Sequence, residues 1–454
     1  MKRLLHSPLL LAVLLSAQMV ATPVRAAVPS HDLLVLRVGT GGGATFVRLS
    51  AGATQAGRPL PLGLFDRSGQ TLYVATDQGS GQSLLRAVDV ASGRVLRVLS
   101  VVGSFSTRTG EYAPDLLTSS TAGANGAAGD TPLSNRIQAV QALRVGHGLT
   151  GGIPADATQM LSALSFNGRW LALRDTTPSN DSRFIVLDTA AMRVIRTVVL
   201  PGFVGLDAIS ADGARLYLVE SLLQYGPHAY QVRLYDLRRG RLDPTAVKDA
   251  SLPTGSMNGI GWTRAWSPDG HWLFTLYVHP GSTGAFIHAL SLQGRVAHCI
   301  DLPDGSARAV DLAHYTLAVS PDGTTLYAIN SVLGHAVAVR GGLPYRVPVL
   351  TRLTARAGSP QMARAGAVLS PDGQTLFVAT DGGVWAVDAH SFTLRATYLA
   401  GQKAASVALT RDGQRLYVLQ PDRGRVIALE PRTGQVLGSV SAQAGAWAIE
   451  QVMK

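Results

Sequence analysis

Residues Val319 to Asn330 read VSPDGTTLYAIN, and nearly the same phrase returns as LSPDGQTLFVATD from Leu369 and as LTRDGQRLYVLQ from Leu409. In the Ser-Pro-Asp-Gly turn, Pro presets φ, Asp can hydrogen-bond back to the backbone, and Gly accepts a positive φ that a Cβ would resist. The residues after the turn alternate and are rich in β-branched and aromatic types, which indicates a strand. The phrase therefore predicts a β-hairpin.

Four looser copies of this hairpin precede the three: LFDRSGQTLYVAT from Leu64, LSFNGRWLALRD from Leu164, ISADGARLYLVE from Ile209 and WSPDGHWLFTLY from Trp266. Successive turn glycines are 99, 45, 57, 53, 50 and 40 residues apart. A period in this range is typical of propellers and solenoids. We therefore expect a repeat array in place of several independent domains.

A second hairpin follows most copies, as in LLRAVDVASGRVLRVLSV (Leu84 to Val101) and GVWAVDAHSFTLRATYL (Gly383 to Leu399). Each unit then has four antiparallel strands, here called a to d, and no long window has the 3.6-residue period of a helix. Four-stranded units at this spacing predict an all-β fold, a β-propeller with four-stranded blades.

The combination of an SPDG turn, an LYV strand and a V-x-V-D strand resembles the YVTN-type propeller repeats of bacteria. The resemblance covers nearly the whole chain after its first 27 residues and implies the propeller fold. It does not select a function, because repeats of this type serve binding proteins and enzymes alike.

The two ends of the chain indicate how the ring closes. DLLVLRV (Asp32 to Val38) and ATFVRLS (Ala44 to Ser50) precede the first hairpin, and AWAIEQV (Ala446 to Val452) follows the last d strand. Joined together, these segments would form a further, three-stranded blade and give eight blades. In the alternative, seven blades form and the terminal strands only augment existing sheets.

Residues 1–27 are typical of a cleaved secretory signal peptide, with Lys2 and Arg3 before an apolar run and small residues around Ala26 and Ala27. We expect one propeller domain over 28–454, exported to the periplasm or beyond the cell. No later segment approaches 18 consecutive apolar residues, so no membrane span is expected after cleavage.

Charge and cysteine content narrow the class of partner. Cleavage would reduce the formal net charge from +11 to +8, and the arginines that carry it are scattered singly. A nucleic-acid footprint would be clustered and interleaved with aromatic residues, so we expect no nucleic acid partner. Cys299 is the only cysteine, which excludes an intrachain disulfide, and its apolar surroundings predict a buried strand residue.

Departures from the minimal repeat concentrate in the connections on one face of the predicted ring. A d-to-a insertion over about 102–157, rich in Gly, Ala, Ser and Thr, accounts for the 99-residue step, and a second extension runs from Arg241 to Trp262. Longer b-to-c loops lie at Thr176 to Arg183, Ser221 to Tyr230 and Val278 to Ala285. Loops on a rigid scaffold commonly carry function.

Polar side chains recur four residues after the leucine of each b strand: Thr76, Asp175, Glu220, Tyr277, Asn330, Thr380 and Gln420, with Asp77, His279 and Asp381 beside them. As a functional interpretation, they surround the channel mouth and converge on a small molecule or metal. As a structural interpretation, each caps its own strand. Asp77, Asp175, Glu220, Tyr277, His279, Asn330, Asp381 and Gln420 are the candidate ligand-binding residues.

The sequence favours a non-catalytic propeller that binds a partner protein, or a small or extended ligand, on the loop-rich face. No cofactor is evident. The alternatives are a metal-assisted, lactonase-like hydrolase that holds Ca²⁺ or Mg²⁺ on Asp175, Glu220 and Asn330, and a propeller accessory subunit of a periplasmic redox enzyme. The oligomeric state and the ligand stay open.

Overall fold

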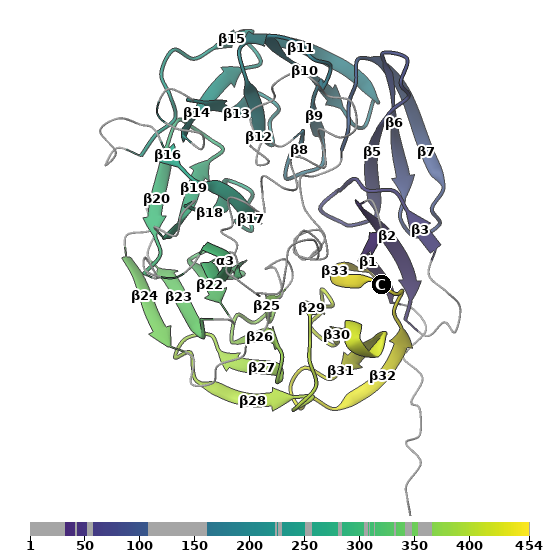
Figure 1. Ribbon diagram of the computed structural model, residues 1–454, viewed down its shortest axis with the longest axis vertical. Coiled ribbons are helices and arrows are strands. Elements are labelled where there is room, and N and C mark those ends of the chain that lie inside the picture. Colours follow the sequence, from purple (N-terminus) through teal and green to yellow (C-terminus); the bar gives the residue numbers. More distant parts are fainter. Residues whose placement is uncertain are drawn as a thin grey trace, which may run out of the picture.

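Eight antiparallel sheets stand around a central axis as the blades of a β-propeller (Figure 1). The computed structural model describes residues 32–40, 43–51, 58–107, 161–222, 225, 229–249, 257–279, 284–303, 307, 309–312, 314–330, 333–340, 347–352 and 366–453. The expected signal peptide and residues 108–157 of the expected insertion lie outside these ranges.

Blades 1 to 4 follow one another along the chain, and each begins with its innermost strand. Blade 1 comprises β4 (Leu64–Phe65), β5 (Thr71–Asp77), β6 (Gln82–Asp89) and β7 (Val95–Val102). Blade 2 comprises β8 (Ser162–Leu164), β9 (Trp170–Arg174), β10 (Asp181–Asp188) and β11 (Arg193–Pro201). Blade 3 comprises β12 (Val204–Ile209), β13 (Arg215–Ser221), β14 (Ala229–Asp236) and β15 (Arg241–Leu242), with β16 (Met257–Asn258) also paired to β14. Blade 4 comprises β17 (Ile260–Trp266), β18 (Trp272–Val278), β19 (Ala285–Ser291) and β20 (Ala297–Asp301).

Blades 5 to 7 continue the same order. Blade 5 comprises β21 (Tyr315–Val319), β22 (Thr325–Asn330), β23 (His335–Arg340) and β24 (Val347–Arg352), preceded by the single-turn helix α3 (Ala309–Leu312). Blade 6 comprises β25 (Ala367–Leu369), β26 (Thr375–Thr380), β27 (Gly383–Asp388) and β28 (Leu394–Tyr398). Blade 7 comprises β29 (Ser406–Leu409), β30 (Leu416–Gln420), β31 (Arg425–Leu429) and β32 (Val436–Ser441), with the 3-10 turn η3 (Pro421–Arg423) after β30.

Blade 8 is shared between the two ends of the chain. The C-terminal strand β33 (Ala446–Met453) is innermost, and β1 (Leu33–Thr40), β2 (Gly43–Ser50) and β3 (Arg58–Leu60) follow outward. Strands β1 and β33 pair antiparallel from Leu33↔Met453 to Val38↔Ala446. The predicted eight blades are confirmed and the seven-bladed alternative is wrong. The prediction of a three-stranded closing blade is also wrong, because the short β3, which contains Pro59, adds a fourth strand.

The hydrophobic core is divided among the gaps between blades. Eight clusters of buried apolar side chains are present in the described chain, one in each gap between neighbouring sheets. Because successive side chains of a strand point to opposite faces, one strand contributes to two clusters. Leu34 and Leu36 of β1 pack towards blade 7, whereas Val35 packs towards blade 1. Closing the ring therefore buries the last apolar face and leaves each sheet only its outer edge.

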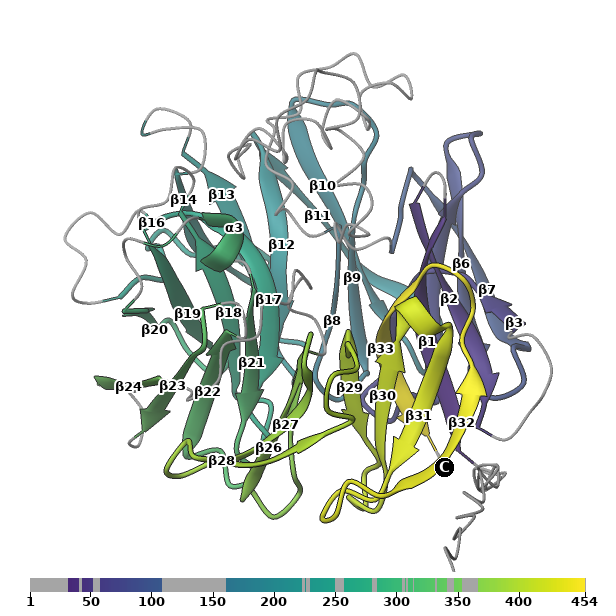
Figure 2. The same cartoon turned by 60° about the horizontal axis from the view of Figure 1, so that its bottom comes forward.

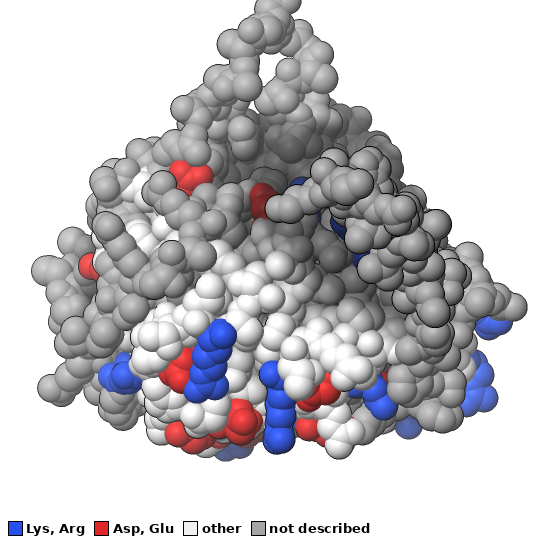
Figure 3. All heavy atoms as spheres, turned by 90° about the horizontal axis from the view of Figure 1, so that it is seen from below, with Lys and Arg blue, Asp and Glu red and all other residues white. Residues whose placement is uncertain are grey.

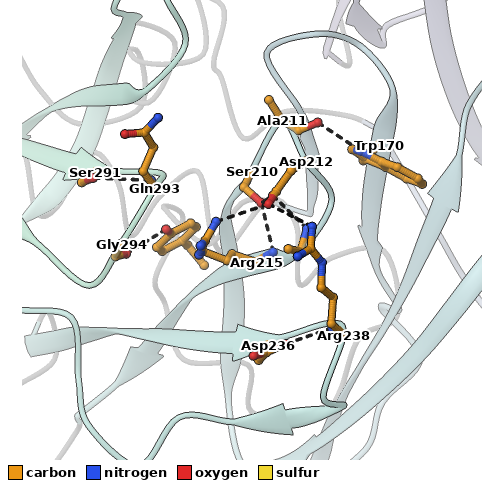
Figure 4. A network of polar contacts seen from close by, with 12 residues as sticks. Trp170, Ser210, Ala211, Asp212, Arg215, Asp236, Arg238, Ser291, Gln293 and Gly294 are labelled. Atoms are coloured by element: carbon orange, nitrogen blue, oxygen red, sulfur yellow. Dashed lines mark hydrogen bonds and ion pairs between the residues drawn. The ribbon is translucent and has the colours of Figure 1, made fainter.

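The recurring hairpin turn is held by its own side chains, which explains why the phrase repeats. In blade 3 the Ser210 hydroxyl donates to Asp212 at 2.5 Å and accepts the Arg215 N–H at 3.0 Å (Figure 4). Gly213 follows with φ +66°, a backbone conformation that favours glycine. The same bond joins Ser320 to Asp322, Ser370 to Asp372 and Thr410 to Asp412 at 2.5, 2.5 and 2.7 Å.

These turns also join neighbouring blades. The Trp170 indole of blade 2 donates to the Ala211 carbonyl of the blade 3 turn at 3.2 Å (Figure 4). Around Asp212 the guanidinium groups of Arg215 and Arg238 lie 3.4 Å from the carboxylate. The turns therefore form one face of the ring, here called the turn face. The b-to-c and d-to-a connections form the opposite face, called the loop face, which points upward in Figure 2.

Candidate functional site

The predicted polar positions do lie at strand ends on the loop face. Asp77, Glu220, Tyr277, Asn330, Thr380 and Gln420 lie at or next to the ends of their b strands, and Asp175, His279 and Asp381 directly follow theirs. Because all b strands run towards the same face, these residues form a ring of positions. Their side chains differ in what they contact.

Two of them are buried and bonded within their own blades. The Asn330 side-chain amide donates to the Asp311 carbonyl at 2.7 Å, and its Oδ1 accepts the Leu333 N–H at 3.0 Å. The Thr380 hydroxyl donates to the Gly383 carbonyl at 2.7 Å. These contacts correspond to the structural interpretation, in which the side chain caps its strand.

Gln420 is also fully buried. Its Oε1 accepts a hydrogen bond from Arg425 Nε at 3.0 Å, and its amide lies 3.4 Å from Gln402 Oε1. Arg425 donates to the same Gln402 oxygen at 3.2 Å. This three-residue network ties the end of β30 to β31 and to the preceding loop. Asp381, after β26, is partly buried.

Tyr277 belongs to the core between blades 3 and 4. Its ring stacks between Tyr230 and Phe286, with centroids 4.9 and 5.2 Å away. The ring of His279, two residues on, lies 5.2 Å from Phe286, and burial lowers the pKa of this imidazole. Tyr277 is therefore a packing residue.

Glu220 accepts hydrogen bonds from the neighbouring c strand, β14. Its Oε2 accepts hydrogen bonds from Gln231 Nε2 and from Arg233 Nη1, both at 2.6 Å. Arg233 in turn donates to the Asp243 carbonyl at 3.0 Å. The carboxylate charge is therefore balanced within blade 3.

Asp77 and Asp175 are the two predicted residues that the structure brings together. The Ser104 hydroxyl donates to Asp77 Oδ2 at 2.5 Å, and the Ser104 N–H donates to Asp175 Oδ1 at 3.0 Å. Arg183 donates to Asp175 Oδ2 at 2.8 Å, and Thr177 donates to Oδ1. The pair joins blades 1 and 2 through the first residues of the predicted insertion.

Those first residues are firmly packed. Phe105 and Thr107 are buried, with 0% and 1% exposure. The Phe105 N–H donates to Ser83 Oγ at 2.8 Å, and Thr107 Oγ1 accepts the Ala75 N–H at 2.9 Å. Gly103 has φ +125°, and a Cβ there would lie 2.5 Å from Asp175 Oδ2. We call residues 103–107 the insertion base.

Both carboxylates at the insertion base are held ionised. The hydroxyl of Ser104 lowers the pKa of Asp77. Burial alone would raise the pKa of Asp175, but hydrogen bonds from Thr177, Ser104 and Arg183 outweigh it and the pKa is lowered. With their oxygens occupied, these carboxylates serve to hold the insertion base in place.

Sequence reasoning missed a bridge between the turns of blades 1, 2 and 4. The Arg67 guanidinium of blade 1 lies 4.0 Å from the centroid of the Phe166 ring of blade 2, and Arg67 Nη2 donates to the Pro268 carbonyl of blade 4 at 3.0 Å. Phe166 also contacts Trp266, with ring centroids 5.6 Å apart. No signal in the hairpin phrases distinguished these residues, since they occupy the variable positions of the turns.

A second missed feature is an apolar outer wall on blades 1 and 2. The side chains involved lie on the outermost strands β7 and β11: Val95, Leu96, Val98 and Val102, with exposures of 44, 46, 56 and 68%, and Val194, Ile195 and Val199, with 38, 40 and 56%. We call this set the outer patch. The signal was present in VLRVLSVV, which is apolar at both strand parities. Side chains of both parities stay exposed, Val95 on one and Leu96, Val98 and Val102 on the other, because neighbouring sheets cover an outermost strand only in part.

Exposed arginines stand among the outer patch, namely Arg97 on β7 and Arg193 and Arg196 on β11. On the side of the ring seen in Figure 3, with the loop face upward, the described Lys, Arg, Asp and Glu gather mainly towards the lower edge. Carboxylates of the turns, such as Asp322 and Asp372, are held by hydroxyl and backbone bonds. The charge pattern therefore follows the repeat.

In the described part of the chain, no group of three or more His, Cys, Asp or Glu side chains is arranged to hold a metal ion. None of the described helices combines the length and hydropathy needed to cross a membrane.

Comparisons with known proteins support the fold. The sequence matches no protein-family model and no curated protein. Among solved structures, apo AztD from Citrobacter koseri is 12% identical with a TM-score of 0.53, covering 94% of this chain and 98% of that one. Dihydro-heme d1 dehydrogenase NirN in complex with DHE is 14% identical with a TM-score of 0.50, covering 96% and 78%. At such identities the likeness shows a shared propeller architecture.

Proposed function

We propose that this chain is an exported binding propeller that captures a partner protein, or another extended ligand, beside the insertion that joins blades 1 and 2. Export is inferred from the signal-like residues 1–27. The binding surface comprises the outer patch and the loop face above it.

The observation that carries this proposal is the outer patch. Seven large apolar side chains stand exposed on β7 and β11, the outermost strands of the two blades that the insertion connects. Large exposed apolar side chains that recur on the outermost strands of two neighbouring blades indicate a candidate interaction surface, since exposed apolar patches commonly mark such sites. An outermost strand also presents unpaired N–H and C=O groups to which an extended segment can add.

The insertion base supports the same location. Buried Phe105 and Thr107 fix the point at which the insertion leaves blade 1, and Asp77 and Asp175 bond to Ser104 from both blades. The proposal gives residues 108–157, which lie outside the described residues, a part in binding the partner.

The test is capture of a partner from an extract of exported proteins, with two variants and one control. One variant replaces residues 108–157 by a Gly/Ser linker and keeps the insertion base, because removing Phe105 would open the gap between blades. The second is Val98→Ser with Val102→Ser. We expect each to weaken binding at least about tenfold, as for interface residues of central importance.

The matched control is Val436→Ser on β32, since Val436 is 51% exposed on the outermost strand of blade 7. It should bind as the parent protein does. Unchanged binding by both variants, or an equal loss in the control, would contradict the proposed site.

The two sequence-based alternatives differ in outcome. A lactonase-like hydrolase requires about one equivalent of Ca²⁺ or Mg²⁺ in calorimetry, lost in Glu220→Gln and Asp175→Asn. A redox accessory role requires that the captured partner carry a redox cofactor. Binding without either signature is what our proposal expects.

A further inference from the structure

A polar row crosses blade 4 on the side that faces blade 3. Arg264, Thr275, His288 and Cys299 are successive register partners across β17, β18, β19 and β20, so their side chains share one face. At its inner end Arg264 donates to Asp207 of blade 3 at 2.8 Å. At the outer half of the row, His288 Nδ1 lies 3.9 Å from Cys299 Sγ, and the Asp249 carboxylate accepts the Cys299 N–H at 2.7 Å.

Three potential metal donors meet at this outer end. Cys299 Sγ lies 3.7 Å from the Met257 sulfur and 3.9 Å from His288 Nδ1. Met257 comes from β16 of blade 3, whereas the other two residues are cross-strand partners in blade 4. A thiol, a thioether and an imidazole therefore converge from two neighbouring sheets.

His288 is the buried member of this group. It is 1% exposed, and its Nε2 has no hydrogen-bond partner among the described residues. The ring directs its other nitrogen, Nδ1, towards the Cys299 sulfur.

We propose that Cys299, Met257 and His288 form a binding site for one soft monovalent metal ion of the Cu(I) type. This inference does not depend on the proposed partner-binding function, because the three residues lie between blades 3 and 4 and outside the outer patch.

The separations suit one bridging ion. Metal bonds of about 2.3 Å to sulfur and about 2.0 Å to an imidazole nitrogen can span two sulfurs up to about 4.6 Å apart, and a sulfur and a nitrogen up to about 4.3 Å apart. The observed 3.7 and 3.9 Å both fall below these limits, at the bent angles of three-coordinate binding.

The donor types select the metal. Thiolate and thioether sulfur favour Cu(I), whereas Ca²⁺ and Mg²⁺ require oxygen ligands. The described chain also lacks a third His, Cys, Asp or Glu ligand here. A zinc site would normally require at least three such ligands.

Binding requires no redox step. The thiol proton leaves to solvent as the metal–sulfur bond forms, so a thiolate with a +1 ion is neutral and no electron is transferred. The Asp249 carboxylate lies beside the site and accepts the Cys299 N–H at 2.7 Å.

The position also allows access. Cys299 is only partly buried and lies on β20, the outermost strand of blade 4, while β16 is an outer addition to blade 3. An ion could therefore reach the sulfur from the periphery. His288 on β19 would close the inner side of the site.

The test is an anaerobic titration of the folded chain with Cu(I), in competition with a chromophoric Cu(I) chelator. We expect one bound ion per chain in the parent protein. Cys299→Ser should abolish binding, and Met257→Leu and His288→Gln should each weaken it at least about tenfold. Ag(I) should bind in the same stoichiometry, since it is soft and redox-inert.

His298→Gln is the matched control, because His298 is adjacent to Cys299 but stacks on Trp272, with ring centroids 6.0 Å apart. Circular dichroism and melting temperature show that each variant is folded, and the parent protein's metal-dependent rise in melting temperature gives a second readout. No bound Cu(I), equal binding by Cys299→Ser, loss of binding in the control, or preference for Zn²⁺ would overturn the proposal.

Discussion

Asp32, at the residue scale, is a buried polar link between the closing blade and blade 7. It is 1% exposed at the start of β1, and its Oδ2 accepts hydrogen bonds from Tyr417 at 2.6 Å and Arg415 at 2.8 Å in blade 7. Burial and this bond raise the pKa of Tyr417. The first described residue of the chain thus joins the blade that precedes the closing one.

We expect Asp32→Asn to lower the free energy of unfolding by about 3 kcal/mol, because it leaves the partly buried Arg415 without its ionic partner. Tyr417→Phe should cost less, about 1–2 kcal/mol, since Asp32 keeps its bond to Arg415. Urea denaturation of the three proteins measures both. A larger loss in Tyr417→Phe than in Asp32→Asn would contradict this ranking.

Asp175 gives the insertion base a pH dependence. Its pKa is lowered in the folded chain, so its contribution is complete above its ordinary value of 3.8 and is lost as the pH falls through the folded value. The parent protein should lose more stability between pH 5 and pH 3 than Asp175→Asn, which keeps an acceptor oxygen without the charge. Urea denaturation at the two pH values is the measurement, and equal losses would contradict it.

At the scale of elements, the turns show what could be read from the chain. Ser, Asp and Gly of the hairpin phrase form the hydrogen-bonded turn that their chemistry predicts. The strands on either side were predictable from the alternation of apolar and polar residues. The bridge of Arg67, Phe166 and Trp266 could not be predicted, because its members meet only when blades 1, 2 and 4 are in place.

Two turn glycines allow the cost of a left-handed backbone to be measured separately from the cost of steric overlap. Gly270 and Gly323 both have φ +72°, but a Cβ at Gly270 would lie 2.0 Å from Phe166, whereas at Gly323 the nearest atom is Pro268 Cδ at 3.5 Å. Gly323→Ala should cost about 1–2 kcal/mol through the left-handed backbone. Gly270→Ala should cost a further 1–3 kcal/mol, roughly, through overpacking. Equal shifts in the denaturation midpoint would contradict the bridge.

The candidate site was predicted less well than the fold, for a physical reason. A polar residue at a strand end can face a ligand or bond within its loop, and only its neighbours decide. Arg233 donates a hydrogen bond to Glu220, and Arg425 donates one to Gln420. Both arginines lie on c strands, and the hairpin phrase does not determine the register of those strands. Asp77 and Asp175 meet because Ser104 lies between them.

For the whole molecule, ring closure explains both the stability of the core and the exposure of apolar side chains on the outermost strands. The described residues form eight apolar clusters, one per gap, so every blade packs on two neighbours, including the blade built from both chain ends. The apolar side chains that remain exposed on β7 and β11 are then surplus to the core. Their location beside the insertion base is what relates the fold to partner capture.

Site-specific photo-crosslinking tests the proposed binding surface most directly. A photoreactive residue replaces either Val98 on β7 or Val436 on β32, which are 56% and 51% exposed on the outermost strands of blades 1 and 7. In the presence of exported proteins, we predict one discrete adduct from position 98 and none from position 436. Equal adducts at both positions, or none at position 98, would contradict the account.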